Sequence, residues 1–221
     1  MGIRFFAIYL SISFSGCSSE RSHSGVDYDH GVYFADQATL NSIISNAIPE
    51  KSLRMSKKTG GEVVFHVPND QTPYTGWAKV TYENGQVEFL NQYKNGKLNG
   101  PYTMWYENGR MESVENYREG ILNGPYADWY PSGQMESREY YVNGQRHGSY
   151  TRWYQNGQKE SEENYKNGKL DGSSIEWYGN GRVEERLSYK DGMPDGAWIY
   201  YNPDGSERYK ETYKNGEIVE D

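Results

Sequence analysis

The residues of this chain best suited to chemistry are carboxylates that recur at a fixed spacing. One glutamate stands 24 residues after the last in five consecutive segments: Glu88, Glu112, Glu136, Glu160 and Glu184. A column of carboxylate oxygens suits Ca²⁺, but the segments match no defined calcium loop. Like charges at strand spacing also repel, so we expect Arg110, Arg182, nearby lysines or turn amides to offset them. We predict no metal site and no cofactor.

The other reactive side chains form no catalytic constellation. The four histidines, His23, His30, His66 and His147, lack metal-ligand spacing, and the sole cysteine is Cys17. Neither a nucleophile elbow nor a phosphate-binding loop is present in the sequence. We therefore predict that the protein is not an enzyme.

A second set of residues with the same spacing is aromatic. Its members are Trp105, Trp129, Trp153 and Trp177. Large aromatic side chains on an open surface are typical interface anchors, which makes these residues candidates for binding a partner. The alternative is that the rings form the core of a thin structure by packing on one another. The sequence leaves both interpretations open.

Glycine shows the element that positions these residues. The first set of glycines recurs every 24 residues at Gly76, Gly100, Gly124, Gly148, Gly172 and Gly196. Further sets follow nine and twenty residues into each unit, and no unit contains an insertion. A fixed period of this length is the signature of a repeat architecture. The sequence predicts six repeats over residues 76–221.

Each unit predicts one β-hairpin. Tyr102–Tyr106 has the aromatic and β-branched make-up of a strand, and Asn108-Gly109 predicts a type I′ turn with positive φ at both residues. Arg110–Arg118 then forms the return strand, and Glu119-Gly120 turns the chain again. The predicted fold class is all-β, an elongated single-layer antiparallel sheet of six 24-residue β-hairpin repeats with twelve strands.

The strand period of two assigns side chains to faces. Tyr106 and its equivalents Tyr82, Tyr130, Tyr154 and Tyr178 should share one face, and the tryptophan column should lie on the other. A third column should form on the return strands, from Tyr93, Tyr117, Tyr141, Tyr165, Tyr189 and Tyr213.

Residues 26–75 predict a small α/β cap. Asp36–Ile48 is a helix candidate because Leu40, Ile43, Ile44 and Ala47 recur at helical spacing. Lys51–Val67 resembles a degenerate hairpin. Because the first unit of a repeat stack has no neighbour, we expect this segment to cover it.

The N-terminus reads as an export signal. Arg4 precedes the apolar run Phe5–Phe14, which is too short to span a bilayer as a helix. The following residues, Phe14-Ser15-Gly16-Cys17, resemble a bacterial lipobox. The small polar residues Ser18–Gly25 have no apolar periodicity and predict a flexible tether at 17–25. The lipobox resemblance implies a lipoprotein signal peptide at 1–16 and lipid attachment at Cys17. It also implies a lipid-anchored protein of the bacterial cell envelope, with Ser18 favouring the outer membrane. The alternative is an ordinary secretory signal that carries a chance cysteine.

The net charge excludes one class of partner. The chain carries a formal charge of −8, so phosphate backbones should repel it and we predict no nucleic-acid binding.

The repeat itself resembles a known family. Tyr106-Glu107-Asn108-Gly109, Glu112 and Tyr117-Arg118-Glu119-Gly120, followed by Gly124-Pro125-Tyr126, are similar to the bacterial MORN repeat variant. The resemblance covers about Pro73 to Gly216. The segment that opens the repeat region, Pro73-Tyr74-Thr75-Gly76, also resembles the corresponding segment of YwqK-type antitoxins. The family implies the hairpin fold, and its antitoxin label implies a toxin as partner.

Three functional hypotheses follow. The first is a non-catalytic, lipid-anchored scaffold that binds an unknown protein partner, since repeat ribbons generally serve as binding surfaces. The second is a toxin-neutralising antitoxin or immunity protein. The third is cell-wall glycan binding through the aromatic columns.

Overall fold

The computed structural model describes residues 37–57, 61, 63–70 and 72–219. The predicted signal peptide, Cys17, the tether and Asp36 lie outside the described residues, as does most of the turn expected at 59–61.

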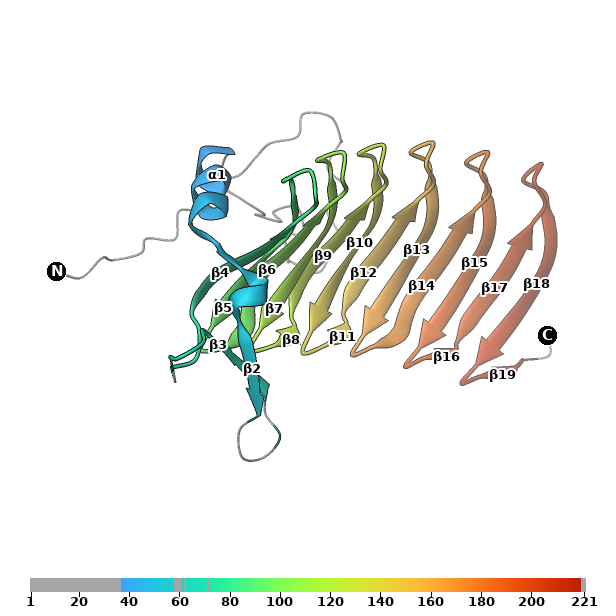
Figure 1. Ribbon diagram of the computed structural model, residues 1–221. Helices are drawn as coiled ribbons and strands as arrows, with labels where there is room; N and C mark the ends of the chain where they lie inside the picture. The colour runs from blue at the N-terminus through green and yellow to red at the C-terminus, as the bar shows by residue number, and fades with distance from the viewer. Residues whose placement is uncertain (1–36, 58–60, 62, 71, 220–221) are drawn as a thin grey trace.

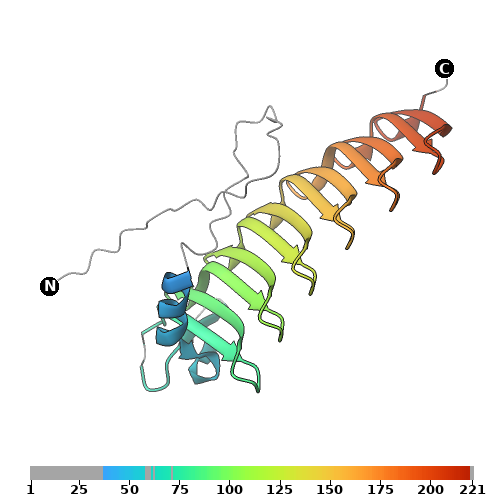
Figure 2. The same cartoon turned by 90° about the horizontal axis from the view of Figure 1, so that it is seen from above.

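The repeat region is one sheet of twelve long strands, which confirms the predicted all-β fold (Figure 1). They are β4 (Gly76–Thr81), β5 (Val87–Lys94), β6 (Lys97–Trp105), β7 (Met111–Arg118), β9 (Gly124–Trp129), β10 (Met135–Val142), β12 (Gly148–Trp153), β13 (Lys159–Lys166), β14 (Lys169–Trp177), β15 (Val183–Lys190), β17 (Gly196–Tyr201) and β18 (Glu207–Lys214). Each long strand pairs antiparallel with the next along the chain. Four two-residue strands extend the turns: β8 (Ile121–Leu122), β11 (Gln145–Arg146), β16 (Met193–Pro194) and β19 (Glu217–Ile218). Figure 2 shows the hairpins as bent arcs stacked in a single layer.

The two turns of each repeat are of different types, and the prediction for the first was wrong. The Tyr106 N–H donates to the Arg110 carbonyl at 2.9 Å, which closes a three-residue loop. Within it only Gly109 has a positive φ, of 80°. Asn108 instead accepts the Arg110 N–H through Oδ1 at 2.9 Å, which favours a type I turn followed by a glycine bulge.

The type I′ geometry belongs to the turn at the opposite edge. Glu119 and Gly120 both have positive φ, of 53° and 81°. The same pairing of positive φ values recurs at Asn95-Gly96, Asn143-Gly144, Asn167-Gly168, Asp191-Gly192 and Asn215-Gly216. Five of the six turns therefore place Asn or Asp in the left-handed region, where these side chains are tolerated best.

The glycine that opens each unit marks a break in the strand. At Gly124 φ is 129°, and a Cβ there would lie 2.9 Å from the Cβ of Asn116. The preceding Asn123 N–H donates to the Asn116 carbonyl at 2.7 Å, between β8 and β9. The 24-residue glycine period therefore reflects a close approach of two strands that leaves no room for a side chain.

Strand register defines the two faces of the sheet. Trp105 lies opposite Met111 and Thr103 opposite Val114 on one face, which we call the tryptophan face. Tyr117 and Glu115 lie on the other, which we call the acidic face.

One tyrosine ties each repeat to the next. The Tyr106 hydroxyl donates to the Trp129 carbonyl at 2.7 Å, and the Tyr130 hydroxyl donates to the Trp153 carbonyl at 2.7 Å. Tyr82, Tyr154 and Tyr178 repeat the bond to Trp105, Trp177 and Tyr201. We call these bonds the tyrosine latch. At the other edge the Gly120 N–H donates back to the Leu98 carbonyl at 2.8 Å, and its equivalents do the same.

The cap contacts the first strands on both faces of the sheet. Helix α1 (Gln37–Asn46) packs Leu40, Ile43, Ile44 and Ala47 against Leu90 and Trp105 on the tryptophan face. Strand β1 (Ile48–Pro49), which was not predicted, pairs parallel with the edge of β4. Beyond it the 3₁₀ helix η1 (Glu50–Ser52) reaches the acidic face, where Glu50 accepts the Tyr93 hydroxyl at 2.8 Å.

The predicted cap hairpin is also present. Strands β2 (Arg54–Lys57) and β3 (Val63–His66) pair antiparallel, and the Phe65 N–H donates to the Gly96 carbonyl at 2.8 Å. Leu53 packs with Ala78 and Tyr93 in a second small core. Within the described part of the chain, no helix has the length and apolar character needed to cross a membrane.

Removing one latch hydroxyl should weaken the array. We expect Tyr130→Phe to destabilise the protein by about 1 kcal/mol, because the Trp153 carbonyl loses its partner. The midpoint of urea unfolding measures this loss. Tyr209→Phe is the control and should leave the midpoint nearly unchanged, because this tyrosine is exposed and water can replace the bond of its hydroxyl to Glu211. Equal midpoints for Tyr130→Phe and wild type would contradict the role of the latch.

Glu119 is the one type I′ position without Asn or Asp. Glu119→Asn should stabilise the protein by up to about 1 kcal/mol, because it relieves the cost of a left-handed backbone. The exposed pair between Lys97 and Glu119, at 3.8 Å, contributes little. Glu119→Gln removes the same charge but keeps the backbone cost. An equal melting temperature for the Asn and Gln variants would overturn the argument.

Candidate functional site

The tryptophan column lies on one face as predicted, but its members differ in burial. Trp105 is 8% exposed and packs in the cluster beneath α1. Trp129, Trp153 and Trp177 are half-buried. Trp105 is therefore a core residue, and the surface left for a partner contains the other three.

Cations lie over two of these rings. The guanidinium carbon of Arg138 is 5.7 Å from the centre of the Trp153 ring, and Lys159 Nζ is 5.5 Å from that of Trp177. Both distances are in the cation–π range. The tryptophan face beyond the cap thus combines half-exposed aromatic rings with positive charges.

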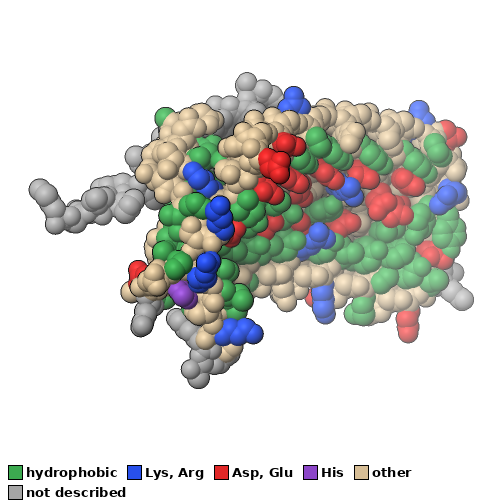
Figure 3. Space-filling view, in the orientation of Figure 1, with side chains coloured by type: hydrophobic (Ala, Val, Ile, Leu, Met, Phe, Trp, Pro, Cys, Tyr) green, Lys and Arg blue, Asp and Glu red, His purple; other side chains and the backbone are tan. Residues whose placement is uncertain are grey.

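The acidic face carries the tyrosines of the return strands, as predicted. Tyr117 donates its hydroxyl to Glu115 at 2.5 Å, and Tyr165 donates to Glu163. Burial, and then the bond to Glu163, raises the pKa of Tyr165 to about 12. These tyrosines therefore stay protonated and act as hydrogen-bond donors. Figure 3 shows acidic side chains gathered among hydrophobic ones, a class that includes tyrosine.

Two members of the glutamate column form ion pairs with an arginine. Arg152 forms ion pairs with Glu136 at 3.1 Å and with Glu160 at 3.2 Å. No cluster of three or more potential metal ligands occurs among the described residues. Arg110 and Arg182, which we considered as partners of this column, donate instead to the carbonyls of Pro131 and Pro203.

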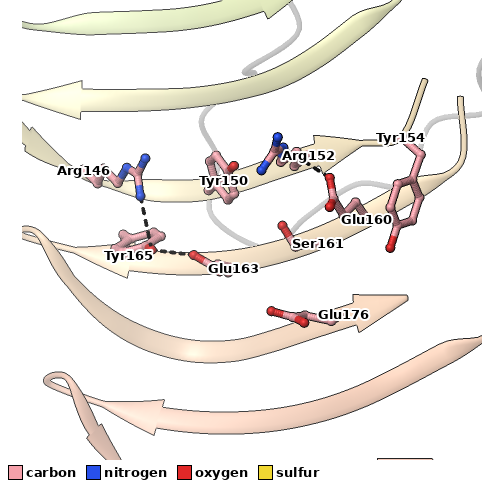
Figure 4. Close-up of a pocket in the computed structure, with 9 residues that line it drawn as sticks. All are labelled: Arg146, Tyr150, Arg152, Tyr154, Glu160, Ser161, Glu163, Tyr165 and Glu176. Atoms are coloured by element: carbon pink, nitrogen blue, oxygen red, sulfur yellow. Dashed lines mark hydrogen bonds and ion pairs between the residues drawn. The ribbon is translucent and has the colours of Figure 1, made fainter. Parts of the chain in front are cut away.

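A second arginine is held on the same face. Arg146 lies with its guanidinium carbon 4.9 Å from the ring centre of Tyr150 and 5.3 Å from that of Tyr165 (Figure 4). Its Nε pairs with Glu139 at 2.5 Å. Burial raises the pKa of Glu139, and Arg146 counteracts this effect. Two tyrosine rings and one carboxylate therefore form a site for a guanidinium group.

Further along the sheet the carboxylates lack such partners. Glu176 and Glu185 lie directly opposite each other in β14 and β15. Partial burial and then the neighbouring glutamates raise the pKa of both carboxyls. Among the described residues, neither they nor Glu163 forms an ion pair. This part of the acidic face therefore has uncompensated negative charge.

Two of these carboxylates, Glu163 and Glu176, border an open hollow of about 310 Å³. Figure 4 shows Arg146, Arg152, Glu163 and Glu176 around it. Its lining is polar and offers donors and acceptors for binding.

Sequence reasoning missed the two arginines and Glu139. The signal was present, because Arg152 interrupts a register position that Asp128 and Glu176 occupy in the adjacent repeats. The same strand parity that placed the tyrosines also places these residues on the acidic face.

The fold and the two faces define a β-hairpin repeat protein whose surfaces suit binding. Five consecutive segments match the MORN repeat variant, at residues 98–119, 122–143, 146–167, 170–191 and 194–215. The chain thus contains MORN-variant repeats, a type often involved in protein or membrane binding. No curated protein is detectably similar to the chain in sequence.

The opposed carboxylates predict a pH dependence. Folding raises the pKa of Glu176 and Glu185 above the ordinary value of 4.5. Between pH 4.5 and the raised pKa values, the folded state therefore binds more protons than the unfolded state. Their contribution to stability should fall as pH rises from 4.5 through the raised pKa values. Melting temperatures across this range should show that contribution in wild type and not in Glu176→Gln/Glu185→Gln.

The control is Glu207→Gln/Glu217→Gln, which removes the same net charge at exposed positions. It should keep the wild-type pH profile. If all three proteins gave the same profile, the opposed pair would not be its source.

Proposed function

We propose that the protein is a non-catalytic scaffold that binds a protein partner on its repeat sheet. The observation that carries the proposal is the row of half-exposed rings Trp129, Trp153 and Trp177, accompanied by Arg138 and Lys159. Aromatic side chains and arginine are the residues that dominate binding energy at protein interfaces.

The shape of the sheet supports this proposal. Helix α1 covers the tryptophan face at the first repeats, and the later repeats extend beyond the cap (Figure 1). A stack of identical hairpins held in register offers an extended and rigid surface. Because such a surface is already ordered before binding, it loses little conformational entropy when a partner binds, which favours affinity.

We further propose that the scaffold belongs to the bacterial cell envelope. The support is the lipobox-like Phe14-Ser15-Gly16-Cys17, with Cys17 as the lipid attachment site and Ser18 favouring the outer membrane. Two acyl chains would anchor the protein stably, whereas one would not. The net charge of −8 disfavours direct binding of the sheet to anionic lipids or nucleic acids.

A crosslinking pull-down of the intact, membrane-anchored protein tests the scaffold. A single stoichiometric protein partner is expected. A toxin as that partner would identify the scaffold as an antitoxin, whereas retention on cell-wall material without any protein would overturn protein binding in favour of a glycan. Cys17→Ser should release the protein from the membrane fraction, and unchanged fractionation would contradict the lipid anchor.

The tryptophan face should carry the binding. We expect Trp153→Ala/Trp177→Ala to weaken the partner complex at least tenfold, since buried aromatic anchors typically contribute 2 kcal/mol or more, as a rough guide. Circular dichroism should show a folded sheet.

The matched control is Ile121→Ala/Met193→Ala, which truncates two exposed apolar side chains near the opposite edge turns. It should bind like wild type. Full binding by the tryptophan variant would exclude this face as the interface.

A further inference from the structure

The acidic face contains a second surface that the tryptophan column does not explain. Three carboxylates, Glu163, Glu176 and Glu185, lie on it with Tyr165 and Tyr189. We call these five residues the acidic cradle. Glu163, Tyr165 and Glu176 border the same hollow, and Glu185 is the cross-strand neighbour of Glu176.

The preceding repeat shows which group fits such a surface. There Glu139 pairs with Arg146, whose guanidinium lies over the rings of Tyr150 and Tyr165. One period later Glu163 and Tyr189 take the places of Glu139 and Tyr165. The carboxylate and one of the aromatic rings are thus repeated.

The cation is not repeated. Leu170 stands at the position of Arg146, and Glu176 stands at that of Arg152. Among the described residues, the ion pairs of this face involve Glu136, Glu139 and Glu160, and none involves the three carboxylates of the cradle. The chain supplies a guanidinium in one repeat and leaves the next without one.

This arrangement has an energetic cost. Glu176 and Glu185 are direct cross-strand neighbours, and like charges at that distance destabilise a sheet. Arg208, whose guanidinium lies 5.8 Å from the centre of the Tyr200 ring, offsets only part of the charge around Glu185. A cation from outside the chain would remove the repulsion.

We propose that the acidic cradle binds arginine side chains of a protein partner. The proposal rests on the scaffold function and names the chemistry of what binds there. Arginine is favoured over lysine because its planar group both stacks on tyrosine and forms paired hydrogen bonds to a carboxylate. Within this protein Arg146 lies over the ring of Tyr150 and forms an ion pair with Glu139. Charge complementarity favours an extended, arginine-bearing segment along the face.

A peptide titration tests the cradle directly. The probe is a fluorescently labelled peptide of alternating glycine and arginine, and fluorescence polarisation with the full chain measures its dissociation constant. A peptide with lysine in place of arginine is the chemical control. We expect the arginine peptide to bind several-fold more tightly, and Glu176→Gln/Glu185→Gln to weaken it about tenfold.

The matched control is Glu207→Gln/Glu217→Gln, which removes two charges away from the cradle and should bind the arginine peptide like wild type. Because the cradle variant loses a repulsion, its melting temperature at neutral pH should not fall, so weaker binding cannot be attributed to unfolding. Equal affinity for both peptides, or equal weakening by both variants, would overturn the proposal. So would a failure of the arginine peptide to bind wild type.

The failure of this inference can be told from failure of the scaffold. The peptide assay needs no natural partner, whereas the pull-down with Trp153→Ala/Trp177→Ala depends on one. A partner captured through the tryptophan face, together with no arginine binding, would leave the scaffold standing and remove the cradle. Arginine binding without any captured protein would support the cradle and count against the scaffold.

Discussion

The structure depends on one hydrogen bond that recurs between each repeat and the next. The hydroxyl of a tyrosine at the end of one hairpin donates to a backbone carbonyl 23 residues later, as Tyr106 does to Trp129 and Tyr130 to Trp153. A single-layer sheet has no opposing layer against which to pack, so its units must be joined edge to edge. Backbone pairing between the strands of neighbouring repeats makes this connection, and the latch at one edge and the glycine N–H at the other reinforce it. Coupling between neighbours is then the main source of stability.

The apolar core is concentrated where the cap meets the sheet. Leu90 and Val114 are fully buried near the first repeats, and at the same register position later repeats have Arg138 and Glu162. Of the four tryptophans in the column, Trp105 is the one that packs beneath the cap helix. The loss of apolar residues along the array leaves polar and aromatic side chains on both faces, the surfaces on which we propose that a partner binds. On one face Arg138 and Lys159 lie over tryptophan rings, and Lys159 also pairs with Glu162, whereas on the other face carboxylates accompany the tyrosines.

Much of this architecture could be predicted from the sequence because the glycine period, the strand parity and the turn residues all indicate one hairpin per unit. The tyrosine and tryptophan columns follow from parity alone. The predicted turn type at Asn108-Gly109 was wrong because the Arg110 N–H donates to the Asn108 side chain. A prediction from the Asn-Gly pair alone does not include this bond. Strand β1 was missed because two residues with a proline carry no strand pattern. The guanidinium site of Arg146 was not predicted because Glu139, Tyr150 and Tyr165, which form it, come from three different strands.

Backbone hydrogen exchange of the intact protein tests the central claim most directly, namely that stability comes from coupling between neighbouring repeats and from the cap. The account predicts graded protection. The slowest amides should lie in β5, β6 and β7, next to the cap, and exchange should accelerate through β10 and β14 to β18. Equal protection in all twelve strands, or faster exchange beside the cap than at β18, would contradict it.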